Sequence, residues 1–77
     1  MRVPRGVAGT VVRVLERLGY STIRQKGSHV RMRHEGPPAH AVTVPLNDPL
    51  KTGTLHCILA EVAQMRSISI EDIVDLL

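Results

Sequence analysis

Residues 26–34 read KGSHVRMRH, and this stretch decides how the middle of the chain folds. Val30 and Met32 alternate with Arg31 and Arg33, which is the period of two of a strand that buries only one face. The glycine and serine before the alternation suit a two-residue hairpin turn. We therefore predict a β-hairpin whose second strand has one buried face and one basic face.

The segments on either side extend this hairpin into a three-stranded antiparallel meander. Strand-forming residues fill 20–26, the alternating run covers 29–35, and a second apolar alternation covers 41–46. Pro45 closes the third strand or places it at an edge, because proline cannot donate to a sheet ladder. Gly36 and the two prolines after it predict a longer loop before that strand.

Helical patterns flank the predicted strands. Residues 9–18 carry apolar side chains at helical spacing, and Gly19 follows as a C-terminal cap. A second helix is expected over about 52–65, and a short third helix begins at Ser67 or Ser69. The prediction is one α+β domain over residues 1–77, in the order α-β-β-β-α, with helices on one face of the sheet and a short extra C-terminal helix.

The composition limits how this domain is stabilised. The chain has 77 residues and one cysteine, so no internal disulfide can form, and Tyr20 is its only aromatic residue. We expect Cys57 to be a buried and inert thiol. No apolar run has the length of a signal peptide core or a membrane span, so we expect a cytoplasmic protein without a membrane partner.

The charge of the chain is strongly polarised. The net charge is +3, but residues 1–34 hold eight basic residues and one acidic residue, whereas residues 35–77 hold two basic and six acidic residues. This asymmetry favours a polyanion such as RNA on the basic side, although ordinary solvated charge is the simpler alternative. The face with Arg31 and Arg33 lacks stacking aromatics, so recognition by shape and phosphate backbone is expected.

Five segments, in this order and spacing, resemble the HicA toxins, also called the YcfA family. They are the helix end LERLGY, the turn QKGSHVRMRH, the strand VTVPL, the loop-to-helix junction LKTGTLHCIL and the tail SISIEDIVDLL. The resemblance implies a fold similar to the double-stranded-RNA-binding domain (dsRBD). It also implies the toxin of a toxin–antitoxin pair, an mRNA interferase that cleaves RNA independently of the ribosome and is held in check by a HicB-like antitoxin.

The same resemblance assigns catalysis to His29, the histidine of the G-S-H motif. The chain departs from the family pattern after VTVPL, where many relatives place a histidine two residues beyond the proline and this chain has Asn47. A second histidine for acid–base chemistry is therefore missing at this position, which leaves open how active the chain is.

Metal-free RNA cleavage proceeds by attack of the ribose 2′-hydroxyl on the adjacent phosphate and needs proton transfer and positive charge. A histidine transfers protons near neutral pH, so we assign one transfer to His29 and leave its acid or base role open. Lys26 is a candidate for stabilising charge on the phosphate, and the main-chain amides of Gly27 and Ser28 are candidates for contacting it. This chemistry requires no metal and no cofactor.

Other residues have competing interpretations. Lys51 and Thr54 open the second long helix, whose N-terminus suits phosphate, but they can equally serve helix initiation alone. His34 and His40 bracket a hairpin loop, and together with His29 they form a possible, less favoured metal site. His56 is expected at the surface.

Two alternatives to the nuclease stay open. A non-catalytic RNA-binding domain of dsRBD type would bind RNA without cleaving it, and Asn47 keeps this alternative in play. A protein–protein adaptor would instead bind through the acidic side of the tail, at Glu71, Asp72 and Asp75.

Overall fold

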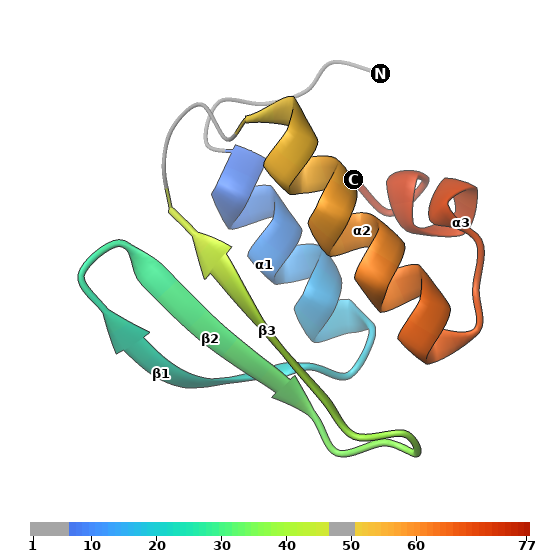
Figure 1. The fold of residues 1–77 in the computed structure, drawn as a ribbon, viewed down its shortest axis with the longest axis horizontal. Helices are drawn as coiled ribbons and strands as arrows, with labels where there is room; N and C mark the ends of the chain where they lie inside the picture. Colours follow the sequence, from blue (N-terminus) through green and yellow to red (C-terminus); the bar gives the residue numbers. More distant parts are fainter. Residues whose placement is uncertain (1–6, 47–50) are drawn as a thin grey trace.

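Helices cover one face of a three-stranded antiparallel sheet in the computed structural model, which describes residues 7–46 and 51–77 (Figure 1). The α+β prediction and its order are confirmed. The first helix begins two residues earlier than predicted, and the second ends one residue later. The elements are α1 (Val7–Arg17), β1 (Ser21–Lys26), β2 (His29–His34), β3 (His40–Pro45), α2 (Thr52–Arg66) and α3 (Ile70–Val74).

Gly19 ends α1 as predicted, because its backbone adopts the left-handed conformation that glycine favours, with φ 101°. The Gly19 amide donates to the carbonyl of Glu16 (3.0 Å), and the Tyr20 amide donates to the carbonyl of Leu15 (2.9 Å). These two bonds form a Schellman motif, which satisfies carbonyls at the helix end. The motif turns the chain into β1 and leaves Tyr20 buried, with 2% of its surface exposed.

The sheet has the order β1-β2-β3. Lys26 lies opposite His29 across the two-residue turn, and Gly27 has φ 57°, which suits the first position of a type II′ turn. Val30 and Met32 are buried, so the predicted alternation along β2 is confirmed. A bulge near the start of β1 leaves the side chain of Ile23 exposed (residue exposure 53%).

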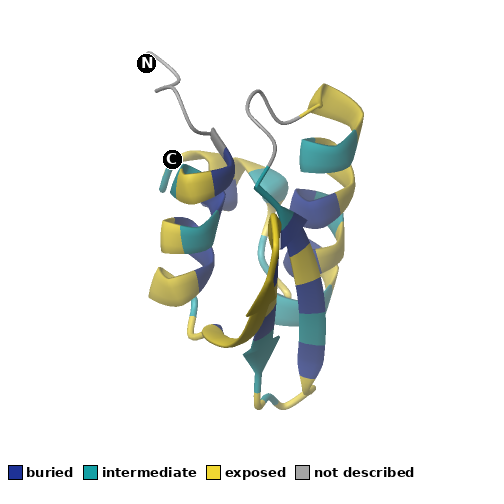
Figure 2. Ribbon diagram, turned by 90° about the vertical axis from the view of Figure 1, so that its left-hand side faces the viewer, coloured by how far each residue is buried: buried dark blue, intermediate teal, exposed yellow. Residues whose placement is uncertain are grey.

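The hydrophobic core lies between β2, β3 and the helices. Both long helices pack against β3, whereas every residue of β1 is exposed (Figure 2). The sheet therefore extends beyond its helical cover on the β1 side, and its outer face is open to solvent. The largest fully buried side chains are Val11, Val14, Leu15, Met32, Val44, Val62 and Ile73.

The C-terminal helices end and begin at serines. Ser67 ends α2 with φ 58°, and Ser69, one of the two predicted starting points of the third helix, caps α3 by accepting a hydrogen bond from the amide of Asp72 at 3.0 Å. Ile73 is buried, whereas its neighbour Val74 is 40% exposed. Within the described ranges no helix is long and apolar enough to cross a membrane.

Candidate nucleic-acid interface

His29 is the first residue of β2 and points to the outer face of the sheet. It lies opposite Lys26 of β1 on one side and Pro45 of β3 on the other, and its side chain is exposed. Its alternation with buried Val30 places it on the face that the helices leave open. The described helices, which pack on the opposite face, therefore do not cover the imidazole.

The turn before His29 is tied to the end of β3. The amide of Leu46 donates to the carbonyl of Ser28 at 2.5 Å, and both Gly27 and Ser28 are exposed. This bond fixes the turn to a neighbouring strand, so the positions of Lys26 and His29 on the outer face are defined by the sheet rather than by a free loop.

Basic residues continue along the outer face from this turn. Arg24 lies directly opposite Arg31, whose Nη1 donates to the Thr43 hydroxyl at 3.1 Å. Like charges opposite each other in a sheet destabilise it, and a bound polyanion would remove that cost. Arg33 lies on the same face but pairs with Glu35 at 3.2 Å, so its charge is partly neutralised.

Arg24 is a further basic residue of the outer face, which the sequence analysis did not single out. If the strands are paired outward from the two-residue turn, Lys26 lies opposite His29 and Arg24 lies opposite Arg31. The sequence therefore contained the information that places Arg24 on the outer face. The predicted contacts Lys26, Arg31 and Arg33 do lie together with His29 on one face, as a consequence of the alternation.

Lys51 and Thr54 lie at the start of α2 and not on the strands or the turn that carry the other predicted contacts. Lys51 is the N-cap of α2, and its carbonyl accepts the amide of Leu55 at 2.9 Å. Both residues line a groove between α2 and β3, where they meet Thr43 at its outer rim. Asn47, the departure from the family pattern, lies outside the described residues.

His34 and His40 face each other across the hairpin, as predicted, but they point toward the helices. His40 is buried and forms hydrogen bonds of 2.7 Å with the Tyr20 hydroxyl and 2.6 Å with Glu61. Because a carboxylate only accepts, His40 donates to Glu61 from Nε2, while Nδ1 shares the second hydrogen bond with the Tyr20 hydroxyl. His29 lies at the other end and on the opposite face of β2, so the three histidines do not meet.

Arg66 closes this buried cluster from the end of α2. Its Nη1 bonds to Nδ1 of His34 at 2.5 Å, its Nη2 donates to the carbonyl of Pro38, and its guanidinium lies 5.8 Å from the centre of the Tyr20 ring. Sequence reasoning missed Tyr20, Glu61 and Arg66 because their contacts join residues 20 or more positions apart. Among the described residues, no group of three or more His, Cys, Asp or Glu is placed to hold a metal ion.

Burial raises the pKa of the Tyr20 hydroxyl above its ordinary value of 10.0; the charge of Arg66 opposes this shift and that of Glu61 adds to it. From about pH 10 upward the unfolded chain loses a proton that the folded chain keeps, so the free energy of unfolding falls as pH rises through this window. We expect urea titrations to show that the stability advantage over Tyr20→Phe is constant below pH 10 and shrinks above it. A constant advantage up to pH 11 would contradict this prediction.

Cys57 is exposed, so the prediction of a buried thiol is wrong. The apolar stripe of α2 buries Ile58 and Leu59, and Cys57 falls at the side of the helix, in the groove beside β3. His56 is exposed, as predicted. A lone cysteine in a helical pattern gives no periodic signal of its own, and only the docking of α2 decides which side it takes.

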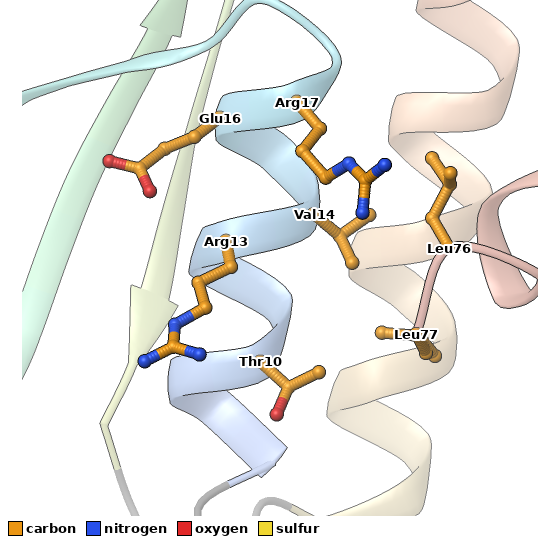
Figure 3. Close-up of a pocket in the computed structure, with 7 residues that line it drawn as sticks. All are labelled: Thr10, Arg13, Val14, Glu16, Arg17, Leu76 and Leu77. Carbon is orange, nitrogen blue, oxygen red and sulfur yellow. The ribbon is translucent and has the colours of Figure 1, made fainter. Parts of the chain in front are cut away.

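A second hollow lies between α1 and the C-terminal residues (Figure 3). Arg17 extends from α1 toward Leu76, while Glu16 points away from it toward the sheet. None of the predicted RNA-contacting residues lines this hollow, so it is separate from the outer face. Its lining residues are Thr10, Arg13, Val14, Glu16, Arg17, Leu76 and Leu77.

Comparison with known proteins gives one match. A family model described as the HicA toxin of bacterial toxin–antitoxin systems matches residues 9–64, which is more than half of the chain. The matched range includes the turn with His29, all three strands and most of α2. Searches of curated proteins and of solved structures find no match.

Proposed function

This chain belongs to the HicA toxin family of bacterial toxin–antitoxin systems, and we propose that it is a metal-independent endoribonuclease whose outer sheet face binds RNA. The observation that carries the proposal is the position of His29, which is exposed on the same face as Lys26, Arg24 and Arg31. A proton carrier set among cations on an open face suits a phosphodiester substrate.

In the proposed reaction the ribose 2′-hydroxyl attacks the adjacent phosphorus, and the bond to the 5′-oxygen of the next nucleotide breaks. His29 either removes the proton of the 2′-hydroxyl or supplies one to the departing oxygen. Lys26, directly opposite, stabilises the negative charge that develops on the phosphoryl oxygens. Arg24 and Arg31 bind the flanking phosphates and set the position of the chain on the RNA.

A non-catalytic RNA-binding domain is the second candidate, and one observation favours it. Within the described ranges, the strands carry no second histidine on the outer face beside His29. The carboxylate of Glu35, at the end of β2, is paired with Arg33. One imidazole supplies only half of an acid–base pair. Water or a group on the RNA would have to complete the nuclease reaction.

Incubation of the purified chain with a mixed RNA substrate separates these functions. The nuclease yields fragments with a 2′,3′-cyclic phosphate, and adding a chelator such as EDTA leaves the rate unchanged. The RNA-binding domain shifts the RNA on a native gel without yielding fragments. Loss of cleavage on chelation would contradict the metal-independent mechanism.

The proposed interface also predicts how binding depends on salt. Phosphate contacts are assigned to three cations, Lys26, Arg24 and Arg31, and each contact on single-stranded RNA contributes a slope of about −0.7, so we expect a total slope of about −2 for log K against log salt. Arg24→Ala should make the slope shallower by about 0.7. Arg17→Ala, an exposed arginine on α1, is the matched control; an equal effect there would place the interface elsewhere.

A further inference from the structure

The helices and the strands of this fold are offset from one another. β1 has no helix above it, whereas α2 lies beyond the free edge of β3 (Figure 1). A fourth strand of the sheet would lie in the space between the free edge of β3 and α2 (Figure 1). A groove of about 620 Å³ occupies this space.

The walls of the groove come from β3 and from one side of α2. The strand contributes Ala41, Val42 and Thr43. Half of the lining residues on the α2 side are small, namely Gly53, Thr54 and Cys57, which leaves room for side chains of another segment. It contributes Lys51, Gly53, Thr54, Cys57, Ile58 and Glu61.

The hydrogen-bond pattern shows which main-chain groups of β3 face this groove. The bond from Leu46 to Ser28 identifies one hydrogen-bonded pair, and such pairs alternate along an antiparallel ladder. Val42 and Val44 therefore bond to β2, while Ala41 and Thr43 direct their N–H and C=O groups outward. Pro45 falls in the outward-facing set, where its missing N–H breaks no bond.

We propose that this edge is the docking site of an extended segment of the antitoxin, which adds to β3 as a fourth strand beside α2. Main-chain bonds to Ala41 and Thr43 would supply affinity, and alternate side chains would fill the groove. Glu61 lies at the His40 end of the groove, and Lys51 begins α2 near its other end. The segment therefore carries a basic residue near Glu61, small apolar residues between, and an acidic residue near Lys51.

The same features disfavour other occupants. A second copy of this chain that paired through its own β3 edge would bring its α2 into the space beside that edge, where α2 of the first copy already lies (Figure 1). A strand added at the opposite edge, on β1, would have no helix to pack against, and the bulge at Thr22–Arg24 interrupts that edge. The groove contains one cation and one carboxylate, which suits a mixed-charge peptide better than a polyanion.

This placement has a consequence for regulation, which rests on the proposed function. Lys51 and Thr54, two of the predicted RNA contacts, line the groove. A strand seated there would cover them and compete with RNA at the N-terminus of α2. His29 lies on the outer face, so this strand alone would not cover it, and another part of the antitoxin would have to do so.

Hydrogen exchange tests the docking directly. The probe is the full-length cognate antitoxin, and the His29→Ala chain is used so that the result does not depend on cleavage. In the free chain, Val42 and Val44 amides should be protected, whereas Ala41 and Thr43 amides should exchange rapidly. Saturating antitoxin should slow exchange at Ala41 and Thr43 by at least about tenfold.

Gln25 is the internal control for this measurement. It lies opposite Val30, whose main-chain groups bond to β3, so the Gln25 amide points outward at the β1 edge. Its exchange should not change in the complex. Unchanged exchange at Ala41 and Thr43, or protection that appears at Gln25 instead, would overturn the proposal. Protection that grows with the concentration of the chain alone would assign the edge to a second copy and overturn it too.

Matched variants test the two components of the site. Thr43→Pro removes the outward N–H, whereas Thr43→Val keeps that amide and removes only the hydroxyl. Cys57→Trp fills the groove, whereas His56→Trp adds the same bulk to an exposed position that does not line it. Calorimetry should show antitoxin affinity at least about tenfold weaker for Thr43→Pro and Cys57→Trp, and within about twofold of the parent for the controls.

The Cys57→Trp arm keeps the test decisive if the proline variant fails to fold. Antitoxin affinity that is unchanged by Cys57→Trp, or equally weakened by His56→Trp, would overturn the proposal. Weaker RNA binding with full antitoxin affinity in Cys57→Trp would assign the groove to RNA. None of these outcomes depends on whether the chain cleaves RNA, so a failure here is distinct from a failure of the nuclease assignment.

Discussion

Replacing His29 with alanine is expected to abolish growth arrest and to lower the RNA cleavage rate by about 10²- to 10⁴-fold, the usual contribution of one positioned acid or base. The side chain is exposed at the start of β2 and makes no contribution to the core. The free energy of unfolding should therefore stay within about 0.5 kcal/mol of the parent. Gel assays of cleavage and urea titrations of stability measure the two effects separately.

His56→Ala is the matched control for this variant, because it removes an equally exposed histidine from α2, away from the turn. It should keep full cleavage and full toxicity. If His29→Ala cleaved RNA as fast as the parent, the assignment of this histidine would be wrong. If it bound RNA normally while the parent also failed to cleave, the RNA-binding alternative would take its place.

Replacing His40 with alanine should lower the free energy of unfolding by about 2–4 kcal/mol. The change removes a buried ring, leaves the Tyr20 hydroxyl without its partner at 2.7 Å, and frees Glu61 from its bond at 2.6 Å. Such a loss is a large fraction of the stability of a small domain. Urea unfolding at neutral pH measures it, with His56→Ala expected within about 0.5 kcal/mol of the parent.

Activity distinguishes the role of His40 from that of His29. At low temperature, where the His40→Ala chain is still folded, its cleavage rate per folded molecule should match the parent. The reason is that His40 lies at the far end of the sheet and on the helix-facing side. A folded His40→Ala chain that fails to cleave RNA would contradict the assignment of chemistry to the outer face.

These two histidines show why residue type alone does not locate a site. Both are the first residues of strands that follow turns, and from residue type alone either could be an exposed polar side chain. His29 belongs to the outward set of an alternation whose inward members are Val30 and Met32, so its exposure was predictable. His40 has the inward parity of Val42 and Val44 in β3, but its hydrogen-bond partners Tyr20 and Glu61 approach it only after the helices dock.

Local patterns determined much of the architecture. The alternation after a two-residue turn fixed the hairpin and its register, since a shift by one residue would expose Val30 and bury an arginine. Gly19 marks the end of α1, because a glycine readily adopts the left-handed conformation that ends a helix. Ser69 marks the start of α3, because its hydroxyl accepts a hydrogen bond from the amide three residues later. The pairing of Arg24 with Arg31 follows from the same register.

By itself, then, the sequence determined the order of the elements, the basic outer face and the position of His29, because each depends on contacts between neighbours or on the period of a strand. Only the tertiary structure decided the cluster around Tyr20, the exposure of Cys57 and the groove between β3 and α2. These features arise where a helix docks against a strand many residues away. No local period encodes that distance, and the docking angle depends on the packing of the whole core.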